Sequence, residues 1–189
     1  MIASPTKIPG LLSISATRHA DDRGFFEEIY SQSAYARAGI GAVFVQDSHS
    51  ITKRAGSVRG LHYQSPPHAQ AKLVRCGHGS LFDVAVDIRV SSPTYGQWHG
   101  EVLSYENGRQ LYIPEGFAHG FITLEDDTEI VYKFSDFYAP ECEGAVRFDD
   151  PDIAIDWPQI DGYATISEKD MRAPMLRDMR SPFNFETVP

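Results

Sequence analysis

The sequence predicts a mainly β fold, a sandwich or barrel of short strands with few helices. Residues 81–90 alternate between apolar and polar side chains, the period-two pattern of a half-buried strand. Further short apolar segments follow at regular spacing, with turn residues between them, which is typical of all-β domains. Only two short stretches have helical character, so a parallel α/β fold, which places a helix between successive strands, is disfavoured.

The individual elements follow in chain order. Residues 31–39 begin with a serine suited to capping a helix and end with a glycine suited to stopping one. A second short helix is expected after Ser167, and the looser spacing after Phe148 indicates a meander that closes over the barrel. Strands are expected at residues 42–46, 72–76, 81–90, 100–104, 110–113 and 128–134.

Length and charge exclude several classes of protein. The 189 residues are expected to form a single domain, 1–189. A formal net charge of −9 argues against a surface that binds nucleic acid or an anionic membrane. No apolar run approaches the ~20 residues that span a bilayer, and the N-terminus lacks the apolar segment of a signal peptide. Because Cys76 and Cys142 make no disulfide framework, we expect a soluble cytoplasmic protein.

Two side chains in the middle of the chain are candidates for catalytic roles. His62 is of the residue type best suited to proton transfer near neutral pH, although a strand histidine can simply bond to a backbone carbonyl. Lys72 shares its parity with Val74 and Cys76, so its ammonium points into the barrel if those residues face the core. A buried cation needs a partner or a ligand; the alternative is a lysine that reaches out to water.

Three further segments carry candidate residues. The glycines and proline of 108–119 form a tight turn that presents His119, although a hairpin with an incidental histidine has the same spacing. Tyr132 shares its parity with Ile130, so its hydroxyl lies on the inner side or belongs to an ordinary core tyrosine. Arg23, among the aromatic and acidic residues of 21–28, is suited to a phosphate, or else lies on an exposed edge strand.

A built-in metal site is not expected. Small β-barrel proteins that bind metal commonly carry His-x-His followed by Glu and a later His. Here Gln64 stands where the second histidine would be, and no glutamate occurs between Tyr63 and Ser80. Signatures of a serine nucleophile, a dinucleotide-binding turn and a phosphate-binding loop are also absent from the sequence.

Nine sequence blocks, in order, resemble the dTDP-4-dehydrorhamnose 3,5-epimerase family. The resemblance runs over about residues 8–176 and leaves 177–189 as a surface tail. Within it, the 108–119 spacing is that of the second cupin motif, whereas the metal-binding half of the first motif is missing. The blocks are residues 22–26, 45–47, 59–64, 72–75, 83–89, 92–94, 113–121, 132–133 and 167–170.

The resemblance implies a cupin-type jelly roll, a homodimer and a nucleotide-sugar substrate, dTDP-4-dehydro-6-deoxy-D-glucose, with neither metal nor redox cofactor. It implies that His62 is the catalytic base with Asp170 as its partner, that Tyr132 is the acid, and that Lys72 faces the developing oxyanion. The positions that match the family's substrate contacts are Arg23, Phe26, Glu28, Gln46, Asp47, Ser48, Arg59, Lys72, His119, Tyr138, Glu143 and Lys169. Arg23 and Arg59 match diphosphate contacts, and Tyr138 matches the residue that stacks on thymine.

The resemblance leaves alternatives and one structural requirement. A relative that inverts only C3 or only C5 can retain the same groups, and a non-catalytic cupin that binds nucleotide sugars and a metal-dependent cupin oxygenase are more distant alternatives.

Arg59 and His62 have opposite parities, so a regular strand would point them to opposite faces. A bulge or a strand end is therefore required if both are to reach one pocket.

Overall fold

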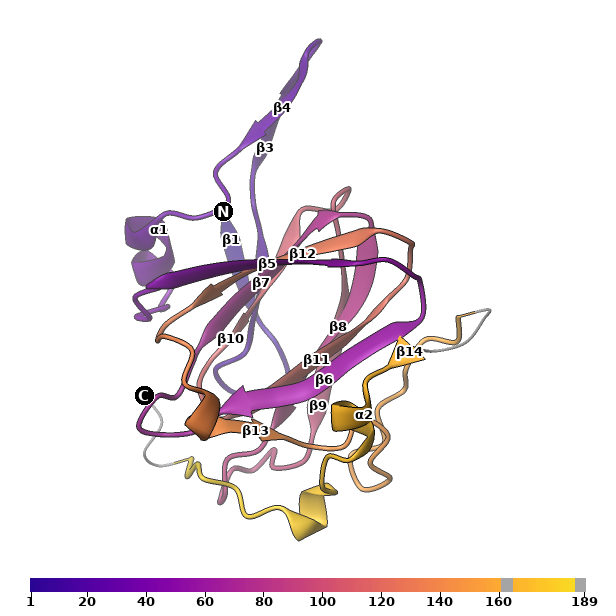
Figure 1. Ribbon diagram of the computed structural model, residues 1–189. Coiled ribbons are helices and arrows are strands. Elements are labelled where there is room, and N and C mark those ends of the chain that lie inside the picture. Colours follow the sequence, from indigo (N-terminus) through magenta and orange to yellow (C-terminus); the bar gives the residue numbers. More distant parts are fainter. Residues whose placement is uncertain (161–164, 186–189) are drawn as a thin grey trace.

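The computed structural model describes residues 1–160 and 165–185, and this part of the chain is mainly β, as the sequence predicted. Two sheets face each other as a jelly roll around a common core (Figure 1). The first sheet has the order β1 (Ile2–Pro5), β2 (Leu12–Ser15), β10 (Arg109–Ile113), β7 (Lys72–His78), β12 (Thr128–Phe134) and β5 (Gln46–Thr52). The second has the order β13 (Glu143–Ala145), β6 (Ser57–Gln64), β11 (Phe117–Thr123), β8 (Ser80–Asp87) and β9 (Trp98–Ser104), with β14 (Thr165–Ile166) also beside β6.

The remaining elements lie around the two sheets. A hairpin of β3 (Arg18–Asp21) and β4 (Gly24–Glu27) projects away from the barrel (Figure 1). The helices are α1 (Gln32–Arg37), α2 (Glu168–Met171) and two single 3₁₀ turns, η1 (Pro140–Cys142) and η2 (Leu176–Asp178). None of the helices in the described residues is long and apolar enough to cross a membrane.

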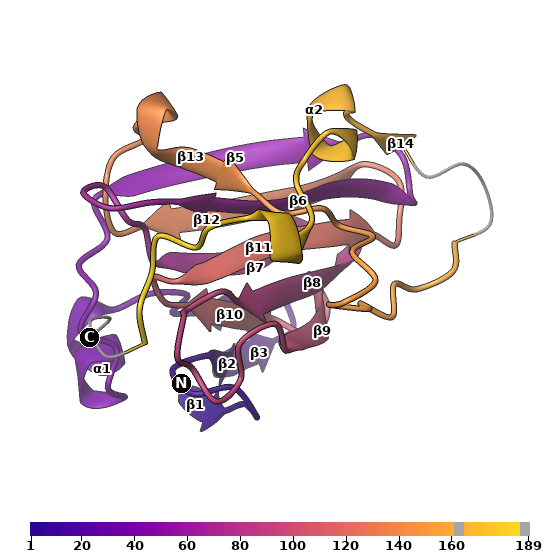
Figure 2. The ribbon, with the colours of Figure 1, turned by 90° about the horizontal axis from the view of Figure 1, so that it is seen from below.

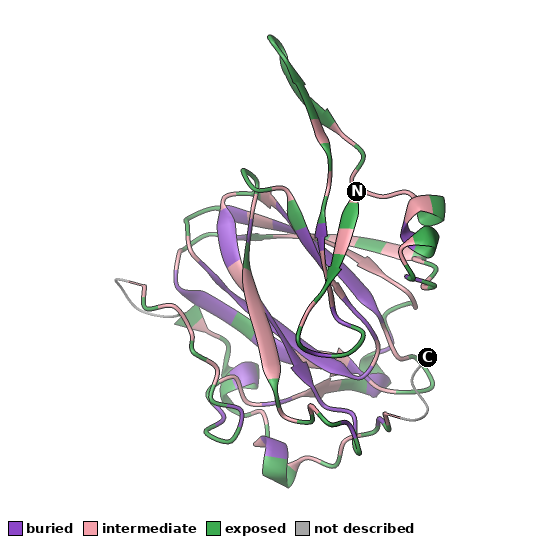
Figure 3. Cartoon of the chain, turned by 180° about the vertical axis from the view of Figure 1, so that it is seen from behind, coloured by how far each residue is buried: buried purple, intermediate pink, exposed green. Residues whose placement is uncertain are grey.

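The core between the sheets comes from the inward-facing residues of both. It includes Val74, Leu81, Leu111 and Ile130, which are all buried. Figure 3 shows buried residues along strands of both layers and exposed ones along the hairpin and the loops. Burial of this apolar surface is the main favourable term in folding, so it fixes how the two sheets lie against each other.

Strand β8 differs from the half-buried strand that its alternation predicted. Both of its faces are buried, and it ends at Asp87. Val84 and Val86 point away from the inter-sheet core, and a second apolar cluster covers them. Asp83, with the same parity as Leu81, therefore faces the barrel interior. The alternation was real, but its polar face points inward because the interior holds a polar site.

The strand expected at 42–46 was wrong, since that segment is irregular and β5 begins at Gln46. Ala42 and Phe44 instead pack beside Tyr35 of α1. β5 itself has no strong apolar pattern. The other expected strands correspond to β7, β8, β9, β10 and β12, and both expected helices are present as α1 and α2.

The C-terminal segment covers the outer face of the second sheet. Leu176 and Phe183 join the cluster that covers Val84 and Val86. Phe183 also accepts a backbone hydrogen bond from Val90, and Figure 2 shows this segment running along the barrel. The tail expected from residue 177 thus packs on its own barrel as far as Phe185, and residues 186–189 lie outside the described part.

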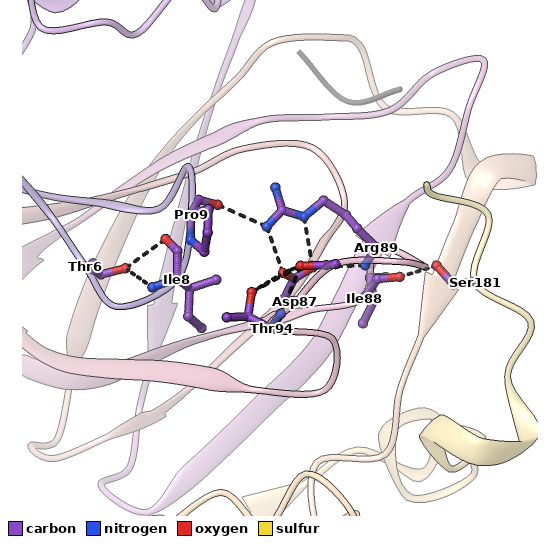
Figure 4. Close-up of polar contacts among 9 residues, drawn as sticks. Thr6, Ile8, Pro9, Asp87, Ile88, Arg89, Thr94 and Ser181 are labelled. Carbon is purple, nitrogen blue, oxygen red and sulfur yellow. Dashed lines mark hydrogen bonds and ion pairs between the residues drawn. The ribbon is translucent and has the colours of Figure 1, made fainter. Parts of the chain in front are cut away.

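A buried ion pair ties three chain segments together at the end of β8 (Figure 4). The Arg89 guanidinium donates to both oxygens of Asp87 at 2.9 and 2.7 Å. The same guanidinium donates to the Pro9 carbonyl at 3.0 Å, and Ser181 donates to the carbonyl of Ile88. Segments from the N-terminal, central and C-terminal parts of the chain therefore meet at one charged pair, whose two side chains are almost wholly buried.

Replacing Arg89 with alanine should destabilise the protein by about 3–5 kcal/mol, because Asp87 would be left as a buried charge without its partner. Urea unfolding followed by circular dichroism measures the loss. The matched control is Arg172→Ala, which breaks an exposed pair with Glu168 and should cost no more than about 1 kcal/mol. Equal losses in the two variants would contradict the structural role of the buried pair.

Candidate active site

A pocket of about 820 Å³ opens between the two sheets. Its walls come from β5, β6, β7, β11 and β12 and from the segment that joins β14 to α2. The sequence-predicted residues that line it are Ser48, Arg59, His62, Lys72, His119, Tyr132, Lys169 and Asp170. All four residues expected to carry the chemistry are therefore brought to one cavity.

A bulge in β6 brings Arg59 and His62 to the same pocket. His119 of β11 pairs with His62, and Phe121 pairs with Arg59, so three steps along β6 face two along β11. The structure thus contains the bulge that the opposite parities required. The two strands approach very closely there, since a Cβ atom on Gly60 would lie 2.5 Å from the Cα atom of Gly120. Gly60 also has φ +128°, a conformation that favours glycine.

His62 is held by a carboxylate on its outer side. Its Nε2 atom lies 2.6 Å from Oδ1 of Asp170. Asp170 is positioned by the first turn of α2, where Ser167 caps the helix by accepting a hydrogen bond from the Asp170 backbone N–H at 3.1 Å. This contact places the Nε2 proton toward Asp170 and leaves Nδ1 as the ring nitrogen that can accept a proton.

The electrostatics of His62 favour the neutral imidazole. Burial lowers its pKa below the usual value, the hydrogen bond and charge of Asp170 act in the opposite direction, and the charges of Lys72 and Lys169 lower it further. The side chain is still 33% exposed, so the ring remains open to the pocket. A neutral imidazole with a free nitrogen is the form that removes a proton.

Lys72 carries a buried ammonium on the opposite sheet. Its Nζ atom donates to the carbonyl of His62 at 3.2 Å. Burial lowers the pKa of Lys72 to about 8, although the charges of Asp83 and Glu143 raise it. The expectation that this side chain points inward with Val74 is confirmed, and a desolvated cation here is suited to stabilise an oxyanion.

Tyr132 lies on the same sheet as Lys72 and faces the second sheet. Its ring stacks on Phe134 with centroids 5.8 Å apart and meets His119 edge-on at 6.3 Å. Burial raises its pKa above the usual value, and the hydroxyl of Ser50, 3.5 Å from Oη, acts weakly against this shift. The phenol is therefore protonated at neutral pH and can donate that proton.

The rim of the pocket holds a chain of polar contacts. Lys169 forms an ion pair with Glu143 at 2.7 Å, and the Tyr138 hydroxyl donates to the same carboxylate at 3.3 Å. The backbone N–H of Tyr138 donates to the side-chain oxygen of Gln46 at 3.1 Å, and Gln46 donates to Ser48 at 3.4 Å. The exposed Tyr138 ring is thus held at the mouth by its neighbours on both sides.

Seven of the twelve residues expected to contact the substrate do not line this pocket. Gln46, Tyr138 and Glu143 belong to the rim contacts just described, and the other four lie elsewhere. Glu28 follows the hairpin, and exposed Asp47 pairs with Lys133 at 2.8 Å. Arg23 and Phe26 lie on the projecting hairpin, where the Arg23 side chain is 89% exposed and forms an ion pair with nearby Asp21 (Figure 1). In the part of the chain that the structure describes, this hairpin therefore points away from the cavity.

The sequence analysis did not assign a role to two residues of the site. Asp83 lies 2.7 Å from the Nε2 atom of His119, and Ser50 is the hydroxyl neighbour of Tyr132. An inward-facing aspartate in an apolar strand was the available signal for Asp83, whereas Ser50 gave none. Across residues 1–160 and 165–185, no group of three or more His, Cys, Asp or Glu side chains is placed to hold a metal ion.

Comparison with known proteins identifies the family. Residues 5–178 match the family profile described as dTDP-4-dehydrorhamnose 3,5-epimerase. The chain belongs to this family. The Salmonella typhimurium dTDP-4-dehydrorhamnose 3,5-epimerase is 49% identical over 177 residues, which cover 93% of this chain and 96% of that protein.

Solved epimerase structures share the fold. The Legionella pneumophila dTDP-6-deoxy-D-glucose-3,5-epimerase, in complex with dTDP-4-keto-L-rhamnose, has a TM-score of 0.90 and 43% identity, and the match covers 100% of this chain and 97% of that one. A 3′-monoepimerase from Streptomyces bikiniensis, in complex with dTDP-quinovose, has a TM-score of 0.85 and 34% identity, covering 92% and 87%. The fold is therefore shared by epimerases of different outcome.

Removing the negative charge of Asp170 should impair His62 as a base. Asp170→Asn is expected to lower activity by about 10²–10⁴-fold and to move the acidic limb of the kcat/KM profile to lower pH, because Asp170 raises the pKa of His62. The measurement is kcat/KM against pH in protein whose fold is checked by circular dichroism. An unchanged profile would show that Asp170 does not act on the base.

Deprotonation of Lys72 should limit activity on the alkaline side. Its pKa of about 8 predicts that kcat/KM falls as the pH rises through that value, because the neutral amine no longer stabilises negative charge. Steady-state kinetics between pH 6 and 10 tests this, with Lys72→Met expected to lose the alkaline limb together with most of the activity. A wild-type profile that stays flat to pH 10 would contradict the assignment.

Proposed function

We propose that this protein converts dTDP-4-dehydro-6-deoxy-D-glucose to dTDP-4-dehydro-L-rhamnose by inverting C3 and C5. One observation carries the proposal. The His62–Asp170 pair and the protonated Tyr132 come from opposite sheets and face the same pocket, with the Lys72 ammonium between the sheets. Inversion needs a base and an acid on opposite faces of a carbon atom, and the two sheets supply them.

The chemistry follows from the ketone at C4. The protons on C3 and C5 are acidic because the electrons left behind delocalise onto the C4 oxygen as an enolate. Nδ1 of His62 takes the proton, and the Lys72 ammonium stabilises the negative charge on that oxygen. Tyr132 then donates its proton to the opposite face of the same carbon. The proton on His62 leaves and the Tyr132 phenolate is reprotonated, so the enzyme returns to its starting state for the second carbon.

The rim supports recognition of the nucleotide. Arg59 and Lys169 line the pocket and supply positive charge for a diphosphate. The exposed Tyr138 ring offers a flat surface on which a thymine can stack. These local charges act at short range, so the net charge of −9 does not prevent binding of an anionic ligand.

We also propose a homodimer in which the hairpin completes the partner's site. Arg23 and Phe26 match substrate contacts of the family, yet they project into solvent on the β3–β4 hairpin. The Phe26 side chain is a large apolar group that a solitary chain leaves exposed. A second copy related by a two-fold axis would place each hairpin over the other chain's pocket.

Inversion at C3 alone is the second candidate, because the Streptomyces bikiniensis relative is a 3′-monoepimerase with the same fold. Proton NMR of the protein with dTDP-4-dehydro-6-deoxy-D-glucose in D₂O separates the two. The expected result is deuterium at both C3 and C5 of the product, dTDP-4-dehydro-L-rhamnose, which a reductase added to the reaction traps. Exchange at one carbon alone would identify a monoepimerase, and no exchange by folded protein that binds dTDP would overturn the proposal.

Mixing two inactive variants tests the exchanged hairpin. Arg23→Ala and His62→Ala homodimers should each be severely impaired, whereas mixed dimers contain one site with both native residues. After subunits are mixed and allowed to exchange, about a quarter of the wild-type activity should return, since half of the dimers are mixed and each has one intact site. If Arg23 served its own chain, every site would carry a defect and no activity would return.

A further inference from the structure

A second histidine–aspartate pair lies deeper in the barrel than the first. His119 is the cross-strand neighbour of His62, and its Nε2 atom lies 2.7 Å from Oδ1 of Asp83. Asp83 has no exposed surface, and among the described residues its second oxygen, Oδ2, accepts no hydrogen bond. The carboxylate is therefore fully desolvated, and only one of its two oxygens, Oδ1, has a hydrogen-bond partner, His119. A buried charge retained under such conditions needs a compensating positive charge nearby.

Lys72 brings a positive charge to the same interior. Its ammonium donates to the carbonyl of His62, and His62 is the cross-strand neighbour of the His119 that contacts Asp83. The two side chains come from facing sheets, Asp83 from β8 and Lys72 from β7, and both point into the barrel. Among the described residues, the other titratable groups that border this interior are His62 and Arg59 of β6, Cys76 of β7, His119 of β11, Tyr132 of β12, His99 and Glu101 of β9, Glu143 of β13, and Lys169 and Asp170 of α2. Most of the anions in this set already have a partner, because Asp170 bonds to His62 and Glu143 pairs with Lys169.

We propose that Asp83 is a positioning residue that keeps the Lys72 ammonium charged across the barrel interior. The inference rests on the role given to Lys72 in the proposed function. Burial alone lowers the pKa of Lys72, and of the two carboxylates that raise it, Asp83 has the larger effect and Glu143 the smaller. An anion in the interior acts more strongly than one at the rim because less water screens it. The ammonium can then meet the oxygen of an enolate in its charged form.

Asp83→Asn is the informative variant because it removes the charge and little else. The amide has the shape of the carboxylate, and its oxygen can still accept the hydrogen bond from His119. Without the anion, the pKa of Lys72 should fall by about 1–3 units, the range found when one opposite charge is lost. At pH 7.5 most of the lysine would then be neutral, so the alkaline limb of kcat/KM should move to lower pH by the same amount.

The direct measurement is an NMR titration of the Lys72 side chain, labelled at Cε and assigned with Lys72→Met. It is made on the wild-type protein and on Asp83→Asn, and the alkaline limb of kcat/KM is measured in parallel. The matched control is Glu101→Gln, which neutralises the residue opposite Asp83 on the neighbouring strand and should leave the titration of Lys72 in place. Asp83→Glu keeps the charge and should restore a limb close to that of wild type.

The outcomes are distinct. A lowered Lys72 pKa in Asp83→Asn alone supports the inference, and an unchanged pKa overturns it. If the pKa falls but the alkaline limb stays, Asp83 acts as inferred and Lys72 is not the catalytic cation of the proposed function. Should the buried variants fail to fold, the Asp83 Cγ resonance of the wild-type protein must inflect as Lys72 titrates, and its failure to do so overturns the inference.

Discussion

The site depends on one constraint, the close approach of two glycines where β6 bulges against β11. Gly60 and Gly120 allow the strands to come so near that any side chain at either position would overlap with backbone. The extra residue in β6 rotates the strand between Arg59 and His62, so that a group suited to a diphosphate and a group suited to proton transfer face one cavity. A regular ladder would place one of them on the outer face, against the C-terminal segment.

Charge inside the barrel is the second condition for chemistry. A jelly-roll interior is normally apolar, and here Asp83, Lys72 and His119 replace part of that core. Asp170 of α2 adds a further buried charge at the wall of the pocket. Each buried charge is costly alone, and the arrangement persists because opposite charges and hydrogen bonds compensate one another. The same low-dielectric surroundings strengthen the interaction of Lys72 with a developing oxyanion.

Sequence reasoning identified what local pattern encodes. The apolar alternation in 128–134 located β12, and the helix expected after Ser167 is present as α2. β5 was missed because a strand that lines a polar pocket has no apolar stripe. Residues 42–46 were assigned as a strand from their apolar side chains, which in the structure pack beside α1 instead. Asp83 was recognised only as part of the polar face of β8. Alternation shows that a strand has a polar and an apolar face, but it does not show which of them points into the barrel. The four residues expected to carry the chemistry line one pocket, whereas Arg23 and Phe26 lie on the projecting hairpin, which no local sequence pattern places.

The placement of base and acid on different sheets has a consequence for how the protein can change. His62 belongs to one layer and Tyr132 to the other, so the gap across which a proton must be removed and returned equals the spacing of the layers. That spacing depends on the volumes of Leu111, Ile130 and their neighbours, an apolar cluster against which Tyr132 itself packs. Conservative repacking of such a core usually costs little stability. In this barrel the same substitutions would widen or narrow the distance between the two proton-transfer groups. The turnover rate would therefore change with the total volume of the core side chains, even where stability hardly changes.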